Sequence, residues 1–176
     1  MLQECSVVRV ANVFFNEPTK PHYLMEIAQK AGIAHTSVKK YLNQMKETGI
    51  IKETAEKKGK RKFPIYTANT ENKEYKKFKR AINLIKIENV TNFLKSKLMP
   101  KTIVLFGSYA RGEDVEESDI DIFIECKKTE LDLSKFEKQL SRKIELHFKE
   151  KFNDYPAELK NNIISGIVLS GYLEAF

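Results

Sequence analysis

The sequence predicts an α+β protein built from two parts, and three observations lead to this prediction. Apolar residues recur at spacings of three and four through most of residues 5–98, which is typical of amphipathic helices. From residue 103 onward, short apolar or alternating segments typical of strands are interspersed with helical ones. Charge divides the chain in the same way, with a net charge of +11 over residues 1–99 and −4 over residues 100–176, which together give the +7 of the chain.

The composition narrows the class of protein. A chain of 176 residues with 41% hydrophobic and 31% charged residues fits a folded globular protein and not a disordered one. No apolar run approaches the roughly 20 residues that span a bilayer, and residues 1–9 lack the pattern of a signal peptide. Cys5 and Cys126 match no metal-ligand spacing. We therefore expect a cytoplasmic protein with reduced thiols and no membrane partner.

The N-terminal part is predicted to begin with three helices. The first carries the apolar residues from Val7 to Phe15 and ends before Pro18. The second covers residues 23–30, and a turn containing Gly32 connects it to a third helix over residues 35–47. Two helices joined by a short glycine-containing turn are typical of a helix-turn-helix.

A hairpin is predicted directly after the third helix. Residues 50–54 and 63–67 are strand-like, and the basic segment 56–62 between them contains Gly59. The stretch from Ile27 to Leu42, followed by Gly49-Ile50-Ile51, resembles winged-helix transcription regulators over residues 5–70. The predicted N-terminal domain, residues 1–70, is therefore a winged helix-turn-helix.

This resemblance implies double-stranded DNA as a partner. The third helix would enter the major groove, and its exposed face carries His35, Thr36, Lys39, Lys40 and Asn43. The hairpin would contact phosphates through Lys57, Lys58, Lys60, Arg61 and Lys62. The alternative is a helical module used for protein contacts, with the charge run simply solvated.

A linking helix is predicted over residues 71–99. Tyr75, Phe78 and Ile82 begin a pattern of apolar residues at helical spacing, and Pro100 ends it. Three arrangements stay open for this helix: a rigid connection between the domains, pairing with its copy in a homodimer, or packing against its own N-terminal domain.

The C-terminal part contains the residues that are suited to binding phosphate and a metal ion. A predicted buried strand, Ile103–Phe106, leads through Gly107-Ser108 into a helix start, where free backbone N–H groups and a hydroxyl suit phosphate. After an acidic loop, Asp119 and Asp121 alternate with apolar residues, which predicts two carboxylates about 7 Å apart on one strand face. Such carboxylates suit Mg²⁺, although Asp-x-Asp alone is often only the solvated face of a strand.

The string from Gly107 to Gly112, with Ser118-Asp119-Ile120-Asp121, resembles the DNA polymerase β-like nucleotidyltransferase superfamily, in particular its minimal nucleotidyltransferase group. The resemblance extends over residues 88–176 and implies a small mixed α/β domain of the nucleotidyltransferase fold, here residues 100–176. Helices are expected at 131–141 and 156–165, with a strand at 143–148 between them.

The resemblance implies nucleotide binding by Gly107, Ser108, Arg111 and Ser118. It implies catalytic and metal-binding roles for Asp119, Asp121 and Glu145, and many relatives have aspartate at the position of Glu145.

The implied activity is a Mg²⁺- or Mn²⁺-dependent transfer of an NMP from an NTP, with ATP expected, to an acceptor hydroxyl, coupled to DNA binding. In this interpretation the carboxylates hold two ions, and Arg111 binds phosphate or pairs with the acidic loop. Two alternatives stay open. One is a nucleotide-sensing winged-helix regulator whose nucleotidyltransferase domain is inactive. The other is an antitoxin-type protein that adds AMP to a partner protein, with a small helical protein as the partner.

Overall fold

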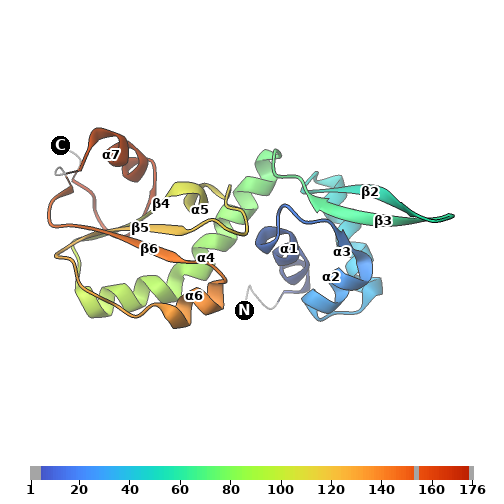
Figure 1. Cartoon of the computed structure of the whole chain (residues 1–176), viewed down its shortest axis with the longest axis horizontal. Helices are drawn as coiled ribbons and strands as arrows, with labels where there is room; N and C mark the ends of the chain where they lie inside the picture. Colours follow the sequence, from blue (N-terminus) through green and yellow to red (C-terminus); the bar gives the residue numbers. More distant parts are fainter. Residues whose placement is uncertain (1–4, 153–154, 175–176) are drawn as a thin grey trace. The chain divides into compact units, whose positions relative to one another are not determined.

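The computed structural model describes residues 5–152 and 155–174, in two compact units, Met1–Phe78 and Lys79–Phe176 (Figure 1). The boundary between the units lies inside α4 (Lys73–Leu98), which confirms the helix predicted after the hairpin. The predicted domain ranges 1–70 and 100–176 include residues 1–4, 153–154 and 175–176, which lie outside the described part. The domain limits at residues 70 and 100 stay predictions.

The N-terminal unit consists of three helices and a small antiparallel sheet, with strand order β1-β3-β2. The three predicted helices are confirmed, and the third has the predicted bounds. The two-residue strand β1 was not predicted, because a strand this short leaves no periodicity in the sequence. The elements before α4 are α1 (Ser6–Asn16), β1 (His22–Tyr23), α2 (Leu24–Ala31), α3 (His35–Glu47), β2 (Ile51–Lys58) and β3 (Arg61–Ala68).

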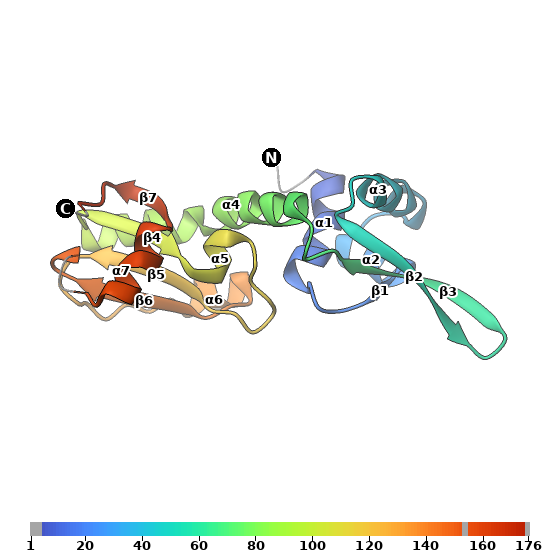
Figure 2. The same ribbon diagram turned by 90° about the horizontal axis from the view of Figure 1, so that it is seen from above.

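The hairpin of β2 and β3 is longer than the sequence indicated, as Figure 2 shows. Cross-strand pairs continue to Lys58 and Arg61, so the turn consists of Gly59 and Lys60 alone. Gly59 has a φ of +61°, the left-handed conformation that a tight hairpin turn needs. The prediction of a basic turn over residues 56–62 is therefore wrong, because most lysines of this segment lie on the paired strands β2 and β3. Their side chains are exposed to solvent, so the strands can pair without burying these charges.

The core of the N-terminal unit lies between the helices and the sheet. Val10 and Phe14 of α1, Ile27 of α2 and Val38 of α3 are buried. The start of α4 belongs to this core as well, because Tyr75 is buried and donates a hydrogen bond of 3.0 Å to the carbonyl of Phe14. Helical spacing in the sequence thus predicted the inward faces of these helices correctly.

The C-terminal unit has a four-stranded mixed sheet in the order β6-β5-β4-β7, in which β5 and β6 are parallel and the other pairs antiparallel. This confirms a mixed α/β arrangement. The helices predicted at 131–141 and 156–165 are present but shorter, and the last strand, β7, was not predicted. The elements after α4 are β4 (Thr102–Phe106), α5 (Gly107–Arg111), β5 (Ile120–Glu125), α6 (Ser134–Leu140), β6 (Ile144–Lys149), α7 (Ala157–Ile164) and β7 (Ile167–Gly171).

Both faces of this sheet are covered. Ile120, Ile122 and Ile124 of β5 point to one face, where they pack with residues of α4 and α6, as alternation predicted. Figure 1 shows α4 and α6 on one side of the sheet and α7 on the other. Phe123 points to the other face and packs with Phe152 and with Ile163 of α7. Asp121 shares the face of Phe123 and lies at the start of the strand, where this second layer leaves it partly exposed. No helix among the described residues is long and apolar enough to cross a membrane.

Candidate active site

The turn after β4 lies directly against the acidic strand β5. Gly107 has a φ of +74°, and a Cβ atom at this position would lie 2.3 Å from Oδ2 of Asp121. Phe106 and Asp121 are also partners in the antiparallel pairing of β4 and β5. Glycine is therefore required at 107 for two reasons, its left-handed backbone and the approach of the carboxylate. The sequence-predicted phosphate turn and the acidic strand meet at this point.

Asp121 and Glu145 lie side by side on neighbouring parallel strands. They are direct register partners in β5 and β6, so their side chains share one face of the sheet. One oxygen from each carboxylate and one nitrogen of His147 all lie within 4.8 Å of one another. The structure thus brings together two of the three predicted carboxylates and adds an imidazole.

His147 was not assigned a role from the sequence. Its Nε2 lies 3.4 Å from Oδ1 of Asp121, and its ring packs edge-on against Phe106 with centroids 5.1 Å apart. A signal was present, because His147 lies two residues after Glu145 in a predicted strand and alternation places both on one face. Only the parallel pairing of β6 with β5 shows that this face also carries Asp121.

Asp119 does not join this group. It is exposed and lies just before β5, which begins at Ile120, so the strict alternation of a strand does not extend to it. The only metal-ligand group in the described part of the C-terminal unit consists of Asp121, Glu145 and His147. The metal-binding and catalytic roles of Asp119 stay predictions.

Three further predicted nucleotide-binding residues lie around the turn. Ser108 is partly buried in α5, next to Gly107. Nε of Arg111 forms an ion pair of 2.8 Å with Glu113. This pairing with the acidic loop is one of the two roles that the sequence analysis gave for Arg111. The hydroxyl of Ser118 accepts a hydrogen bond of 2.9 Å from the N–H of Val115 and so shapes the acidic loop. Their contacts with a nucleotide stay predictions.

The acidic loop is anchored to α4 through a buried carboxylate. Asp114 is 2% exposed; it forms an ion pair of 3.2 Å with the equally buried Lys79 and accepts a hydrogen bond of 2.9 Å from Asn83. Burial lowers the pKa of Lys79, although the charge of Asp114 opposes this effect. Burial also lowers the pKa of Lys86, about two turns after Lys79 along α4, to about 8. This buried polar network holds the loop that joins the glycine turn to β5.

The donor atoms present fit a divalent cation. Carboxylate oxygens are the ligands that Mg²⁺ prefers, whereas an imidazole nitrogen suits Mn²⁺ and Zn²⁺ better. The side chain of Asp121 is 26% exposed, so a cation bound there would remain accessible to a substrate. The contact of Gly107 with Asp121 would bring phosphates bound at the turn close to that cation.

The residues predicted to contact DNA are exposed in the N-terminal unit. On α3 these are His35, Thr36, Lys39, Lys40 and Asn43. On the hairpin they are Lys57, Lys58, Lys60, Arg61 and Lys62. One of them is partly engaged within the protein, because Nζ of Lys58 lies 3.3 Å from Glu56 and 4.5 Å from the ring centroid of Tyr23.

Comparison with known proteins places a family match on the C-terminal unit. Residues 87–169 match the family model described as "Nucleotidyltransferase domain". Three proteins of Methanocaldococcus jannaschii, each named "Putative protein adenylyltransferase", are 69%, 60% and 56% identical over 32, 40 and 36 residues. These matches cover 18%, 22% and 20% of this chain, and 32%, 40% and 37% of the relatives.

The chain thus spans between about a third and two fifths of the length of these curated relatives. No solved structure gives a significant match. The family match includes Gly107, Asp121, Glu145 and His147, which are the residues that the structure brings together. Residues 87–169 are therefore the part of this chain that is similar to the nucleotidyltransferase domain.

Proposed function

We propose that the C-terminal unit transfers an NMP from an NTP to an acceptor hydroxyl with the help of a divalent metal ion. The observation that carries this proposal is the approach of Asp121 to Gly107, with Glu145 beside it on the parallel strand. A triphosphate needs N–H donors for its phosphates and carboxylates for the cation that accompanies it. The glycine turn offers the donors, and the neighbouring strands offer the carboxylates.

The roles of individual residues follow from their positions. The hydroxyl of Ser108 and the N–H groups at the start of α5 would bind the phosphates. Asp121, Glu145 and His147 would hold the metal ion, with Asp119 contributing from the exposed segment before β5. Arg111 would exchange its ion pair with Glu113 for a phosphate. When bound, Mg²⁺ or Mn²⁺ would offset the negative charge of the triphosphate and of the pyrophosphate that leaves.

The names of the relatives suggest the substrates. Protein adenylylation is the transfer of AMP from ATP to a protein side chain, so we infer ATP as the donor and a protein hydroxyl as the acceptor. This corresponds to the antitoxin-type alternative, in which the acceptor belongs to a small helical partner. We also propose a cytoplasmic location, in which Cys5 and Cys126 would stay reduced.

We further propose that the N-terminal unit is a winged-helix module that binds double-stranded DNA. The proposal is supported by the exposed polar and basic face of α3 and by the exposed lysines of the long hairpin. A helix of this kind fits the major groove, and a long basic hairpin fits the phosphates beside it.

Transfer is tested by incubating the purified protein with Mg²⁺ and each α-³²P-labelled NTP, alone and with extract of its source. We expect ATP to label a protein band, and Asp121→Asn and Glu145→Gln to lower labelling at least about 100-fold. Asp119→Asn is expected to abolish transfer as well. Glu130→Gln is the matched control, because Glu130 is an exposed carboxylate of the same unit outside the metal-ligand group.

The same experiment distinguishes nucleotide transfer from the second candidate function, regulation by nucleotide sensing. Labelling by Asp121→Asn at the rate of the unsubstituted protein would rule out the proposed site. If nothing is labelled, but ATP binds and changes the affinity for DNA, the protein is instead a nucleotide-sensing regulator. If the label appears on nucleic acid, transfer is confirmed and the inferred protein acceptor is wrong.

A further inference from the structure

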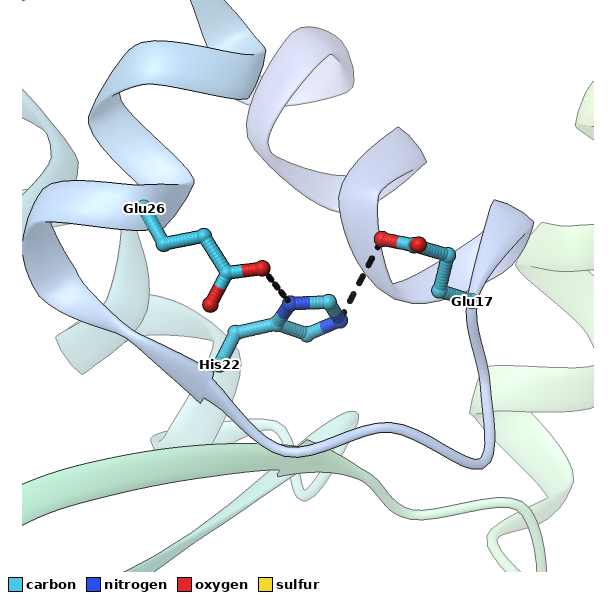
Figure 3. Close-up of side chains that lie close together, drawn as sticks. All are labelled: Glu17, His22 and Glu26. Atoms are coloured by element: carbon cyan, nitrogen blue, oxygen red, sulfur yellow. Dashed lines mark hydrogen bonds and ion pairs between the residues drawn. The ribbon is translucent and has the colours of Figure 1, made fainter.

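A second group of metal-ligand side chains lies in the N-terminal unit (Figure 3). Glu17 directly follows α1, His22 opens β1, and Glu26 lies in the first turn of α2. One ligand atom from each of the three lies within 4.8 Å of the other two. Segments from three different elements thus converge on one point inside a single unit.

The imidazole is held in a fixed orientation. The side chain of His22 is fully buried, its backbone pairs with Tyr66, and its ring packs edge-on against Phe14 at 5.6 Å. Nδ1 of His22 lies 3.1 Å from Oε1 of Glu26. Nε2 has no hydrogen-bond partner among the described residues, and Oε2 of Glu17 lies 3.9 Å from it (Figure 3). A buried polar atom without a partner costs free energy, so this nitrogen is poised for a ligand.

The two carboxylates face the same position and remain accessible to solvent. The side chains of Glu17 and Glu26 are 26% and 36% exposed. Lys30 pairs with both of them, and its Nζ lies 2.7 Å from Oε1 of Glu26. The position between the carboxylates therefore attracts positive charge.

We propose that Glu17, His22 and Glu26 form a binding site for a divalent first-row transition metal ion such as Zn²⁺, in which Nε2 of His22 and Glu17 are the ligands and Glu26 holds the imidazole through Nδ1. An imidazole nitrogen and a carboxylate are ligands that Zn²⁺ accepts, with water completing its coordination. Mg²⁺ and Ca²⁺ prefer oxygen ligands alone and would gain less from His22. Lys30 is a competitor that the metal ion displaces; because its side chain is 37% exposed, it can turn outward. This proposal does not depend on the nucleotidyltransferase activity.

The bound ion would join the end of α1 to β1 and α2. Because the unfolded chain lacks the preformed site, metal binding would stabilise the folded N-terminal unit. We expect Zn²⁺ to raise the thermal unfolding temperature by several degrees, and equal concentrations of Mg²⁺ to change it much less.

The test uses the full chain with Asp121→Asn, Glu145→Gln and His147→Asn, so that the candidate active site does not contribute. Isothermal titration calorimetry with Zn²⁺ should give one ion per chain, and Co²⁺ should give the visible absorption of a nitrogen- and oxygen-ligated ion. Adding Glu17→Gln or His22→Gln should weaken binding at least about tenfold. Glu17 is partly exposed, so its substitution tests the site even where His22→Gln impairs folding.

Lys30→Met and Lys20→Met provide a matched pair of variants. Both remove one positive charge near Glu17, but Lys20 pairs with Glu17 alone, whereas Lys30 also pairs with Glu26. Lys30→Met should tighten Zn²⁺ binding clearly more than Lys20→Met. The proposal is overturned if the triple variant binds no ion, if Glu17→Gln binds as well as its parent, or if the two lysine variants have equal effects.

Discussion

Gly107 combines two structural requirements in one residue. Gly107→Ala would place a side chain in a left-handed conformation, which costs about 1–2 kcal/mol, and would push its Cβ against Asp121. We expect nucleotide transfer to fall at least about 100-fold, which corresponds to about 2.7 kcal/mol of transition-state stabilisation. Initial rates and urea unfolding, measured on the same preparation, separate the effect on transfer from the effect on stability.

Gly59→Ala is the control for this substitution. Gly59 has a similar φ of +61°, but a Cβ there would meet no atom within 4 Å. The Gly59→Ala variant should therefore have a lower free energy of unfolding, because of its backbone conformation, and an unchanged rate of nucleotide transfer. Equal transfer rates for the two variants would mean that the contact between residue 107 and Asp121 does not matter for the reaction.

His147 gives the candidate metal site its nitrogen ligand. Because imidazole favours Mn²⁺ over Mg²⁺, His147→Asn should weaken Mn²⁺ binding about tenfold and Mg²⁺ binding less. Mn²⁺ affinity can be measured by electron paramagnetic resonance of the free ion, and Mg²⁺ affinity by its competition with Mn²⁺. His35→Asn, on the exposed surface of α3, is the control. An equal loss of affinity for both ions would argue against direct ligation by His147.

The acidic loop depends on its anchor to α4. Asp114→Asn would leave the charge of Lys79 buried without its carboxylate, and breaking a buried ion pair in this way costs about 3–5 kcal/mol. We expect this loss in the free energy of unfolding, measured with urea. Asp132→Asn, at an exposed position before α6, should cost less than about 1 kcal/mol. A similar value for both variants would show that Asp114 does not anchor the loop.

Lys86 of α4 should make stability depend on pH. Burial lowers its pKa in the folded protein to about 8, against an ordinary value of 10.5. Between these two pH values the unfolded chain binds more protons, so the free energy of unfolding rises with pH, by at most about 1.4 kcal/mol per pH unit for one group. Urea unfolding at pH 7.5, 8.5 and 9.5 should show a rise that Lys86→Met reduces. Parallel pH profiles for the two proteins would contradict this prediction.

The whole chain has its positive charge concentrated before residue 100. If the N-terminal unit binds DNA, affinity should fall steeply with salt, and each lost phosphate contact should lower the slope of log K against log salt by about 0.9. Lys60→Ala with Lys62→Ala should reduce the slope equally for every DNA sequence. Asn43→Ala should instead change the sequence preference by about 1–3 kcal/mol.

Lys95→Ala with Lys97→Ala is the charge-matched control. Both lysines are exposed on the last turn of α4, far along the chain from the hairpin. Fluorescence anisotropy with labelled duplexes at several salt concentrations measures all of these variants. If the control pair lowers the slope as much as the hairpin pair, the interaction is a general effect of net charge and not a contact of the hairpin.

Local sequence patterns determined several helices and strands of this protein and the faces that their side chains take. Helical spacing predicted α3 with its bounds, and alternation predicted the buried isoleucines of β5 and the orientation of Glu145. Gly107 could be identified because a glycine between a buried strand and a helix start is a local feature. Such features depend on the conformation of a few neighbouring residues, so they can be predicted from the sequence alone.

Only the tertiary structure decided which of these residues meet. The parallel register of β5 and β6 places Glu145 beside Asp121 and brings in His147, while the late start of β5 leaves Asp119 outside the group. In the same way, the short strand β1 carries His22 to the glutamates of two neighbouring segments. Strand pairing and burial are set by contacts between distant segments, and local periodicity tells which face a side chain takes but not what that face meets.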